Sequence, residues 1–435
     1  MTELSLPQVK SPLFSLPNLD RIIRGLLLVF IFSLPFKGLL FVERNGFIIL
    51  LVMLGLWCTV HRGVFFRSTP IDLPLVAFAL WVAITIPFAT YPLYSLKEFG
   101  KLLQQGLVFY TVVFFFQDKT SRALLIRFLV GASLIVSFYG LTQFDWTDIQ
   151  SVMSFLPAEV WLTTYLIMLI PLCFALAWYE ERSWVKGFYS LGVLLPTCCL
   201  FLTRSRAGLL AFLVELWALA YLLRHRAMLI AASMSSLAVL LAGVMFIKVA
   251  TAPDGALYLE SRAGAAFNTN VKSIVHRFDI WAFSLEQMVE RPVMGIGYGK
   301  ETAKMLFGQV PEEVQPGHEP VRQQGTHNIL LELGLHVGLP GLMLFVWLAI
   351  CLGRTIIAGF RQVTDLWEKA ILLGASVSFI GLAVRLQFDQ MLVGSLAMQF
   401  WILMALAIIS RDSLSEKFSP VVGDDRRDVH EPMTA

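Results

Sequence analysis

Two arginines at the start of an apolar run are the first residues whose types and spacing could do chemistry. Residues 203–208 read Thr-Arg-Ser-Arg-Ala-Gly, and the apolar run begins directly after them. An arginine near the hydrocarbon of a membrane is costly, and an anionic ligand offsets that cost. The guanidinium fork matches phosphate oxygens, and a helix N-terminus adds its own positive end. The pattern predicts a phosphate site at Arg206 and Arg204, with contact to lipid headgroups as the alternative.

A histidine precedes a second apolar run. His327 and Asn328 are followed by nine residues, then Gly338, two further residues and Gly341. Histidine titrates near neutral pH and is a natural general base for a hydroxyl group. Because glycine and proline interrupt a helix, a short helix over 329–337 should enter the membrane and break at Gly-Leu-Pro-Gly. His327 is therefore predicted as a base at the outer mouth of a broken helix, with a polar interface anchor as the alternative.

Arg277 lies in a segment with helical periodicity, which predicts an amphipathic helix over 273–290. Its apolar residues recur at spacings of four, three, four and three: Ile274, Phe278, Trp281, Leu285 and Met288. This stripe should lie on the membrane surface or cap the helical bundle. Arg277 would then flank the stripe and reach an anion at the interface, unless it is simply exposed to solvent.

Alternate glycines follow that helix, since residues 291–300 read Arg-Pro-Val-Met-Gly-Ile-Gly-Tyr-Gly-Lys. Such glycines permit close approach of the backbone and can form an anion-binding nest. Gly297, in their centre, is thus a candidate for substrate binding, and a structural turn is the alternative. The spacing fits neither a P-loop nor a dinucleotide-binding fingerprint.

Arg385 and Asp389 are one helical turn apart at the outer end of another apolar run. An ion pair between them is the simplest interpretation. A direct part in substrate binding is the alternative.

The elements that must position these residues are membrane helices. Hydrophobic residues make up 57% of the 435 and charged residues 15%, with a mean hydropathy of +0.70, which indicates a bilayer as solvent. A spanning helix needs roughly 20 mainly apolar residues. The twelve or so candidate stretches are 22–36, 46–60, 71–89, 102–116, 123–141, 160–178, 187–202, 207–223, 227–249, 337–358, 370–387 and 391–410. The predicted fold is therefore an all-α polytopic membrane protein, and the net charge of +3 gives no indication of a nucleic-acid partner.

The distribution of lysine and arginine predicts the orientation of the chain. An even number of spans places both termini on one side, and the excess of basic residues on the terminal side makes it cytoplasmic. Residues 1–249 then hold nine transmembrane helices and 250–326 form one large periplasmic loop. Residues 327–410 hold three further helices, and 411–435 form a cytoplasmic tail.

In this order the motifs resemble those of the bacterial O-antigen ligase family, the WaaL type, within the larger group that includes O-antigen polymerases. The likeness is specific at Ser-Arg-Ala-Gly over 205–208, at His276-Arg277 with the glycine segment after it, and at His327-Asn328 with Gly-x-x-Gly nine residues later. It implies a GT-C-like glycosyltransferase of the bacterial inner membrane that acts in lipopolysaccharide biosynthesis. By that likeness the donor is O-antigen on undecaprenyl diphosphate and the acceptor is a sugar hydroxyl of lipid A-core.

The resemblance also implies catalytic roles for Arg206, Arg277 and His327. The two arginines would stabilise the charge that builds on the leaving diphosphate, and the histidine would take the proton of the acceptor hydroxyl. Direct displacement inverts the anomeric configuration. We expect no cofactor and no metal. Membrane glycosyltransferases often hold a metal with two acids in an early outer loop, but here that loop has only Glu43, and Asp145 and Asp148 of a later loop have two residues between them rather than the usual one.

Three other functions compete with this hypothesis. A polymerase of the same superfamily would join glycan repeats to one another, and a protein O-oligosaccharyltransferase would transfer the glycan to serine or threonine hydroxyls. A secondary transporter should show paired broken helices with ionisable residues near the middle of the membrane.

Overall fold

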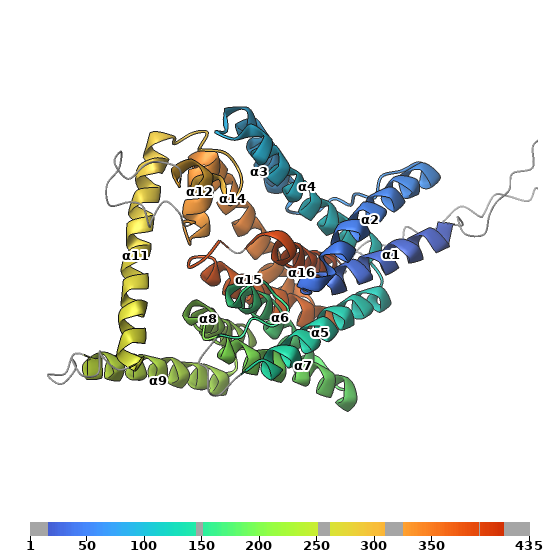
Figure 1. The fold of residues 1–435 in the computed structure, drawn as a ribbon. Coiled ribbons are helices and arrows are strands. Elements are labelled where there is room, and N and C mark those ends of the chain that lie inside the picture. The colour runs from blue at the N-terminus through green and yellow to red at the C-terminus, as the bar shows by residue number, and fades with distance from the viewer. Residues whose placement is uncertain (1–15, 145–150, 251–261, 309–324, 391, 413–435) are drawn as a thin grey trace, which may run out of the picture.

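The computed structural model describes residues 16–144, 151–250, 262–308, 325–390 and 392–412 (Figure 1). Within these ranges the chain forms fourteen α-helices and no β-strand, which confirms the predicted all-α class. Asp145, Asp148 and nearly all of the predicted tail lie outside the described residues.

Nine helices precede the large loop. They are α1 (Leu16–Ser33), α2 (Leu40–His61), α3 (Asp72–Thr85), α4 (Pro92–Phe115), α5 (Lys119–Thr142), α6 (Glu159–Tyr179), α7 (Ser183–Leu202), α8 (Arg206–Leu223) and α9 (Arg226–Ala250). The loop contains α11 (Arg262–Glu290) and α12 (Thr302–Phe307), and the chain continues through α14 (Ile329–Gln362), α15 (Leu366–Arg385) and α16 (Gly394–Asp412). Each of the twelve predicted stretches coincides with one of these helices.

Eight of the described helices are long and apolar enough to cross a membrane, which makes the chain a polytopic membrane protein. They are α2, α5, α6, α7, α8, α14, α15 and α16. The helical segments Asp72–Phe88 and Arg226–Ala238 are apolar but shorter. The figure of about twelve spans therefore stays a prediction.

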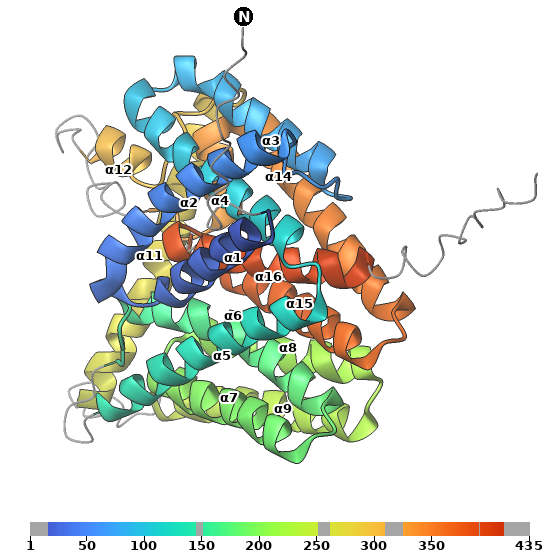
Figure 2. The ribbon, with the colours of Figure 1, turned by 90° about the vertical axis from the view of Figure 1, so that its right-hand side faces the viewer.

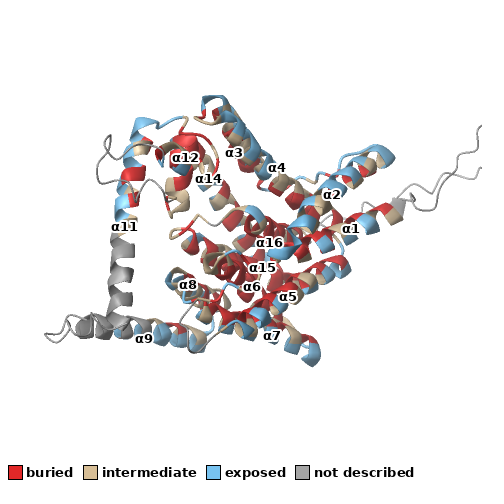
Figure 3. Ribbon diagram, viewed as in Figure 1, coloured by how far each residue is buried: buried red, intermediate tan, exposed pale blue. Residues whose placement is uncertain are grey.

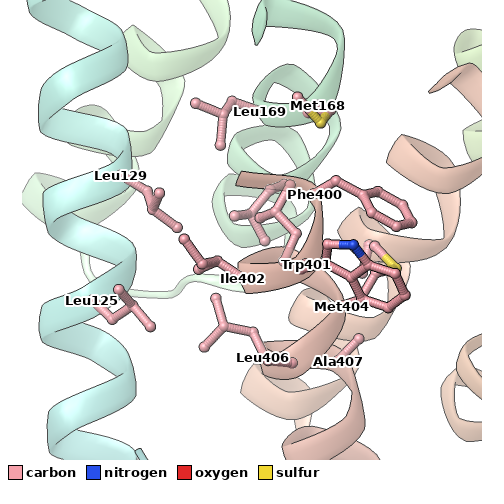
Figure 4. Close-up of a cluster of buried hydrophobic side chains, with 14 of the residues drawn as sticks. Leu125, Leu129, Met168, Leu169, Phe400, Trp401, Ile402, Met404, Leu406 and Ala407 are labelled. Atoms are coloured by element: carbon pink, nitrogen blue, oxygen red, sulfur yellow. The ribbon is translucent and has the colours of Figure 1, made fainter. Parts of the chain in front are cut away.

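Helices α6, α15 and α16 form the buried centre of the bundle, whereas the outer faces of α2 and α7 are exposed and apolar (Figures 2 and 3). Figure 4 shows aliphatic side chains of α5 and α16 facing one another, among them Leu129 and Ile402. Small residues allow the closest approaches. A Cβ added to Gly374 of α15 would lie only 2.6 Å from Cα of Leu172 in α6. Close backbone packing thus fixes the frame that carries the site.

Helix α14 breaks where the sequence predicted it. Gly338 has φ 72° and ψ 176°, and Pro340 follows inside the helix. A break of this kind leaves backbone groups without helical partners, and buried groups must find others. The carbonyl of Val337 accepts a hydrogen bond from Nε1 of Trp81 at 2.8 Å.

Residues 291–299, which we call the strap, form hydrogen bonds with other backbone groups at the break. The amides of Ile296 and Gly297 donate to the carbonyls of Leu335 and His336, both at 3.0 Å. In return the amide of Leu339 donates to a strap carbonyl, that of Pro292, at 2.8 Å. The end of α11 is thereby tied to the start of α14.

Candidate active site

The face that helix α11 turns to the bundle overlaps only in part with the predicted stripe. Phe278 and Leu285 of that stripe are exposed, whereas Met288 and partly buried Trp281 pack with Ile280 against the break in α14 and against α12. The side chain of Ile274 lies outside the described residues. Arg277 is one turn from Ile280 on the packed side, so it points into the bundle rather than along its edge.

The turn between α15 and α16 is the place where the separate motifs meet. Nη1 of Arg277 donates to the carbonyl of Phe388 at 2.5 Å. The backbone amide of His327 donates to Oε1 of Gln390 at 2.8 Å. Nδ2 of Asn328 donates to the carbonyl of Gln387 at 3.2 Å. Residues 386–390 therefore hold both the loop helix and the start of α14.

His327, just before α14, lies next to Asp389 of this turn. Nδ1 of His327 is 3.6 Å from Oδ1 of Asp389, and His327 has a φ of 51°. At this distance Nδ1 has no hydrogen bond within the described residues, and catalytic contacts often shorten when substrate binds. On its other side, Asp389 accepts from Nη2 of buried Arg385 at 3.4 Å. The predicted ion pair of Arg385 and Asp389 is present, and it holds the carboxylate beside His327.

The charge of Asp389 is well stabilised. Burial by itself would raise the pKa of this carboxyl, but the contact with His327 and the charges of Arg385 and Arg277 outweigh burial and hold the pKa below its ordinary value. A carboxylate that stays ionised beside Nδ1 favours the tautomer with its proton on that nitrogen. Nε2 of His327 is then left to accept a proton.

Arg206 of α8 and Arg277 of α11 are near enough for their charges to interact. Burial lowers the pKa of Arg277, Asp389 opposes this effect, and the like charge of Arg206 lowers the pKa further. Arg206 is exposed in the first turn of α8, where Ser205 caps the helix by accepting from the amide of Gly208 at 3.2 Å. Within the described part of the chain its side chain has no hydrogen bond or ion pair. Two like charges that interact in this way are stabilised when an anion binds between them.

Other predicted site residues have structural contacts of their own. Asn328 caps α14, because its Oδ1 accepts from the amides of Leu330 and Leu331. Gly297 has φ 118°, its amide is used by the strap, and a Cβ there would lie 2.6 Å from that of Ala89. Arg204 is exposed, with a φ of 53°. Direct contact of these three residues with substrate stays a prediction.

The sequence did not single out Gln390, which lies between His327 and a cavity that Gln390 lines. Its side-chain amide is in contact with Gly325, where a Cβ would lie 1.8 Å from Nε2 of Gln390. A lone glutamine carries no motif, so only the fold shows its position. Glu332 and His336 are also better placed than their sequence suggests, since both line the same cavity.

A metal site is not evident in the described residues, where no three His, Cys, Asp or Glu side chains are grouped to hold an ion. Metal-independent chemistry stays a prediction, since Asp145 and Asp148 are not described.

The fold and the site together define a polytopic helical membrane protein with arginines, a histidine and an aspartate gathered at one end of its bundle. Residues 191–346 match the family model described as O-Antigen ligase, so this part of the chain is similar to the O-antigen ligase superfamily. The match contains Arg206, Arg277 and His327, but ends before Arg385 and Asp389. No match was found among curated proteins.

Proposed function

We propose that this protein is an O-antigen ligase, which transfers O-antigen from undecaprenyl diphosphate to a sugar hydroxyl of lipid A-core. The observation that carries the proposal is that Arg206, Arg277 and the His327–Asp389 pair, from four distant segments, interact at one end of the bundle. A paired cation site suits a diphosphate, and a base beside it suits a hydroxyl nucleophile.

In the proposed reaction the acceptor oxygen forms a bond to the anomeric carbon of the donor as the bond from that carbon to the diphosphate oxygen breaks. Nε2 of His327 takes the hydroxyl proton, and the neighbouring Asp389 stabilises the imidazolium that results. Undecaprenyl diphosphate leaves with its new negative charge facing Arg206 and Arg277. Attack in line with the leaving group inverts the anomeric configuration.

The isoprenoid chain of the donor needs an apolar place beside the diphosphate. A cavity of about 470 Å³ between α14, α15 and α16 suits it, with a lining of mostly apolar side chains that runs from Gln387 near the site to Arg354. We assign the tail to this cavity. The site would face the periplasm of the bacterial inner membrane, with both termini in the cytoplasm, as the distribution of basic residues predicts.

The competing functions differ in acceptor or in architecture. A polymerase or a protein O-oligosaccharyltransferase would use the same arginines with another acceptor. A transporter should have ionisable residues around paired broken helices near the middle of the membrane. Among the described helices α14 is the one with non-helical backbone inside it, and the charges near its start lie at a helix end.

Reconstitution tests the proposal. Purified protein in liposomes is mixed with undecaprenyl-diphosphate O-antigen and core-lipid A, and we expect the joined product, including in the presence of a chelator. Lengthened glycan without joining would favour the polymerase, and glycosylated protein the oligosaccharyltransferase. Activity lost to a chelator and restored by a divalent ion would refute the metal-independent mechanism.

Two histidine variants complete this test. His327→Ala should lower the rate by about 10² to 10⁴-fold, the contribution of a general base. The matched control is His225→Ala, because His225 is exposed in the turn between α8 and α9. Near-normal transfer by His327→Ala in folded protein would refute the assigned base.

A further inference from the structure

A cavity of about 300 Å³ with a lining of polar and apolar side chains lies between α4, α14 and the start of α16. It adjoins the candidate site at Gln390, whose side chain lines the cavity and also accepts the hydrogen bond from the amide of His327. None of the arginines of the site is in its lining.

Two polar groups in its wall lack partners. Glu332 and His336 of α14 are 5% and 2% exposed, and Nδ1 of the histidine is 3.4 Å from Oε1 of the glutamate. Oε2 of Glu332 accepts from Thr326 at 2.7 Å, but Oε1 of Glu332 and Nε2 of His336 have no hydrogen bond. Buried polar atoms without partners are rare and costly, so a ligand with hydroxyl groups would satisfy them.

The rest of the lining is partly apolar, with Leu333, Leu392 and Met398 among it, and its polar and aromatic residues have the composition of a sugar site. Gln104, Gln105 and Gln390 contribute amides, which can both donate and accept hydrogen bonds. Trp161 and Tyr298 contribute aromatic rings that can pack against the C–H face of a sugar ring. The charged lining residues are of both signs: Glu43, Glu98, Glu332, Lys101 and Lys300. Such a mixture suits a neutral polyhydroxyl ligand better than a phosphate.

The position of the cavity indicates which sugar it holds. Helix α8, which carries Arg206, and helix α4, which lines the cavity, lie on opposite sides of α15 and α16 in both views of the ribbon (Figures 1 and 2). An in-line displacement brings the nucleophile to the anomeric carbon from the side away from the leaving group. With the diphosphate at the arginines, the attacking hydroxyl therefore comes from the direction of the cavity.

We infer that this cavity binds the acceptor sugar ring, with Glu332 and His336 as positioning residues that hydrogen-bond its hydroxyl groups. The inference rests on the proposed function for the identity of the acceptor. In this arrangement His327 takes the proton of the attacking hydroxyl, and the cavity binds the rest of the sugar ring. Acceptor specificity is then determined by residues of α4, α14 and the start of α16.

A kinetic experiment separates acceptor binding from donor binding. At saturating donor, Glu332→Gln and His336→Gln should each raise the KM for acceptor about tenfold or more, the effect of losing one hydrogen bond to a buried group. The KM for donor should not change. The matched controls are Glu286→Gln and His225→Gln, which alter exposed residues of the same types. An unchanged acceptor KM, or a raised donor KM, would overturn the inference.

A binding experiment covers the case in which these buried substitutions prevent folding. The probe is the water-soluble oligosaccharide released from core-lipid A by deacylation, added without donor to wild type and to Trp161→Ala. Trp161 is partly exposed at the cavity wall, so its variant should fold and lose most of the binding. Binding of equal strength to the two proteins would refute the cavity assignment. Binding by wild type that transfers no glycan would instead support the cavity and refute the proposed function.

Discussion

At the scale of single residues, Asp389 determines how His327 can act. A carboxylate next to Nδ1 keeps the proton of the imidazole on that side and stabilises the positive ring that proton transfer creates. Arg385 in turn holds the carboxylate from behind. The three residues form a chain in which only the histidine is open to substrate, since its side chain is 28% exposed.

Replacement of Asp389 by Asn tests this chain of contacts. Transfer should fall about a hundredfold, because the imidazole loses its orientation and its counter-charge. The depressed pKa of Asp389 also stabilises the fold above the ordinary value of 3.8, and this contribution is lost as the pH falls through the lower value of the folded state. The thermal midpoint of the wild type should therefore drop in acid, and that of the variant should be lower at neutral pH and depend less on acid.

The control for this variant is Asp279→Asn, an exposed substitution on α11. The double variant Arg385→Gln with Asp389→Asn removes both charges, so recovered stability without recovered activity is expected. Full activity of Asp389→Asn would contradict the orienting role.

Arg206 can be tested without disturbing the fold, because its side chain is exposed and has no partner in the described residues. Arg206→Ala should lower kcat/KM for the donor about a hundredfold, the loss typical of one group that stabilises developing charge. Arg206→Lys should recover only part of it, since an ammonium group lacks the bidentate fork. Donor kinetics and a thermal midpoint measure the two effects. Arg226→Ala, at the first residue of α9, is the matched control, and equal losses in the two alanine variants would refute a specific role.

At the scale of elements, the break in α14 and the strap form one unit. The break frees carbonyls that the strap amides satisfy, and Gly338 lets the strap carbonyl of Val293 pass where a Cβ would lie at 1.9 Å. The end of α11 is fixed by the same contacts, and Arg277 with it. The two glycine motifs of the sequence are therefore two halves of a single packing arrangement.

Gly338→Ala tests this unit. The added Cβ collides with backbone, and φ 72° is unfavourable for alanine, so the variant should lose roughly 1–3 kcal/mol of stability or more and most of its activity. Thermal unfolding in detergent and transfer assays measure the two losses. The control is Gly131→Ala in α5, where a Cβ meets nothing within 4 Å and alanine favours the helix. Equal behaviour of the two variants would contradict the coupling of strap and break.

The same elements show which features could be predicted from the sequence and which could not. The positions of Arg206 and His327 at helix starts and the break in α14 were predictable, because a run of apolar residues marks a helix and glycine with proline interrupts it. The face of α11 was not, since a helix between protein and lipid is apolar on both sides, as exposed Phe278 and buried Ile280 show. Gln390 and the strap were also beyond prediction, because amide contacts and backbone hydrogen bonds leave little trace in residue types.

At the scale of the whole molecule, charges gather at two ends of the bundle for different reasons. At the starts of α5 and α15, buried Arg122 and Glu368 are joined at 2.6 Å, and Lys119 pairs with Asp365 at 2.7 Å. At the opposite end of α15 lie Arg385 and the candidate site. Both acids of the first set are paired with basic residues of the protein. In the second set Arg206 is exposed and has no hydrogen bond or ion pair among the described residues, so it is available to a ligand.

The distribution of basic residues predicts that the end of the bundle with the candidate site faces the periplasm. We expect Glu286→Cys, exposed on α11, to react with a membrane-impermeant maleimide in intact cells. Arg182→Cys, between α6 and α7 at the predicted cytoplasmic end, should react only after the membrane is opened. The parent chain with its five natural cysteines gives the background, and that of Cys198 matters most because it is exposed. Labelling of both positions from the same side would contradict the predicted topology. The reverse pattern would place the site in the cytoplasm and refute periplasmic transfer, because His327 and α11 belong to one end of the bundle.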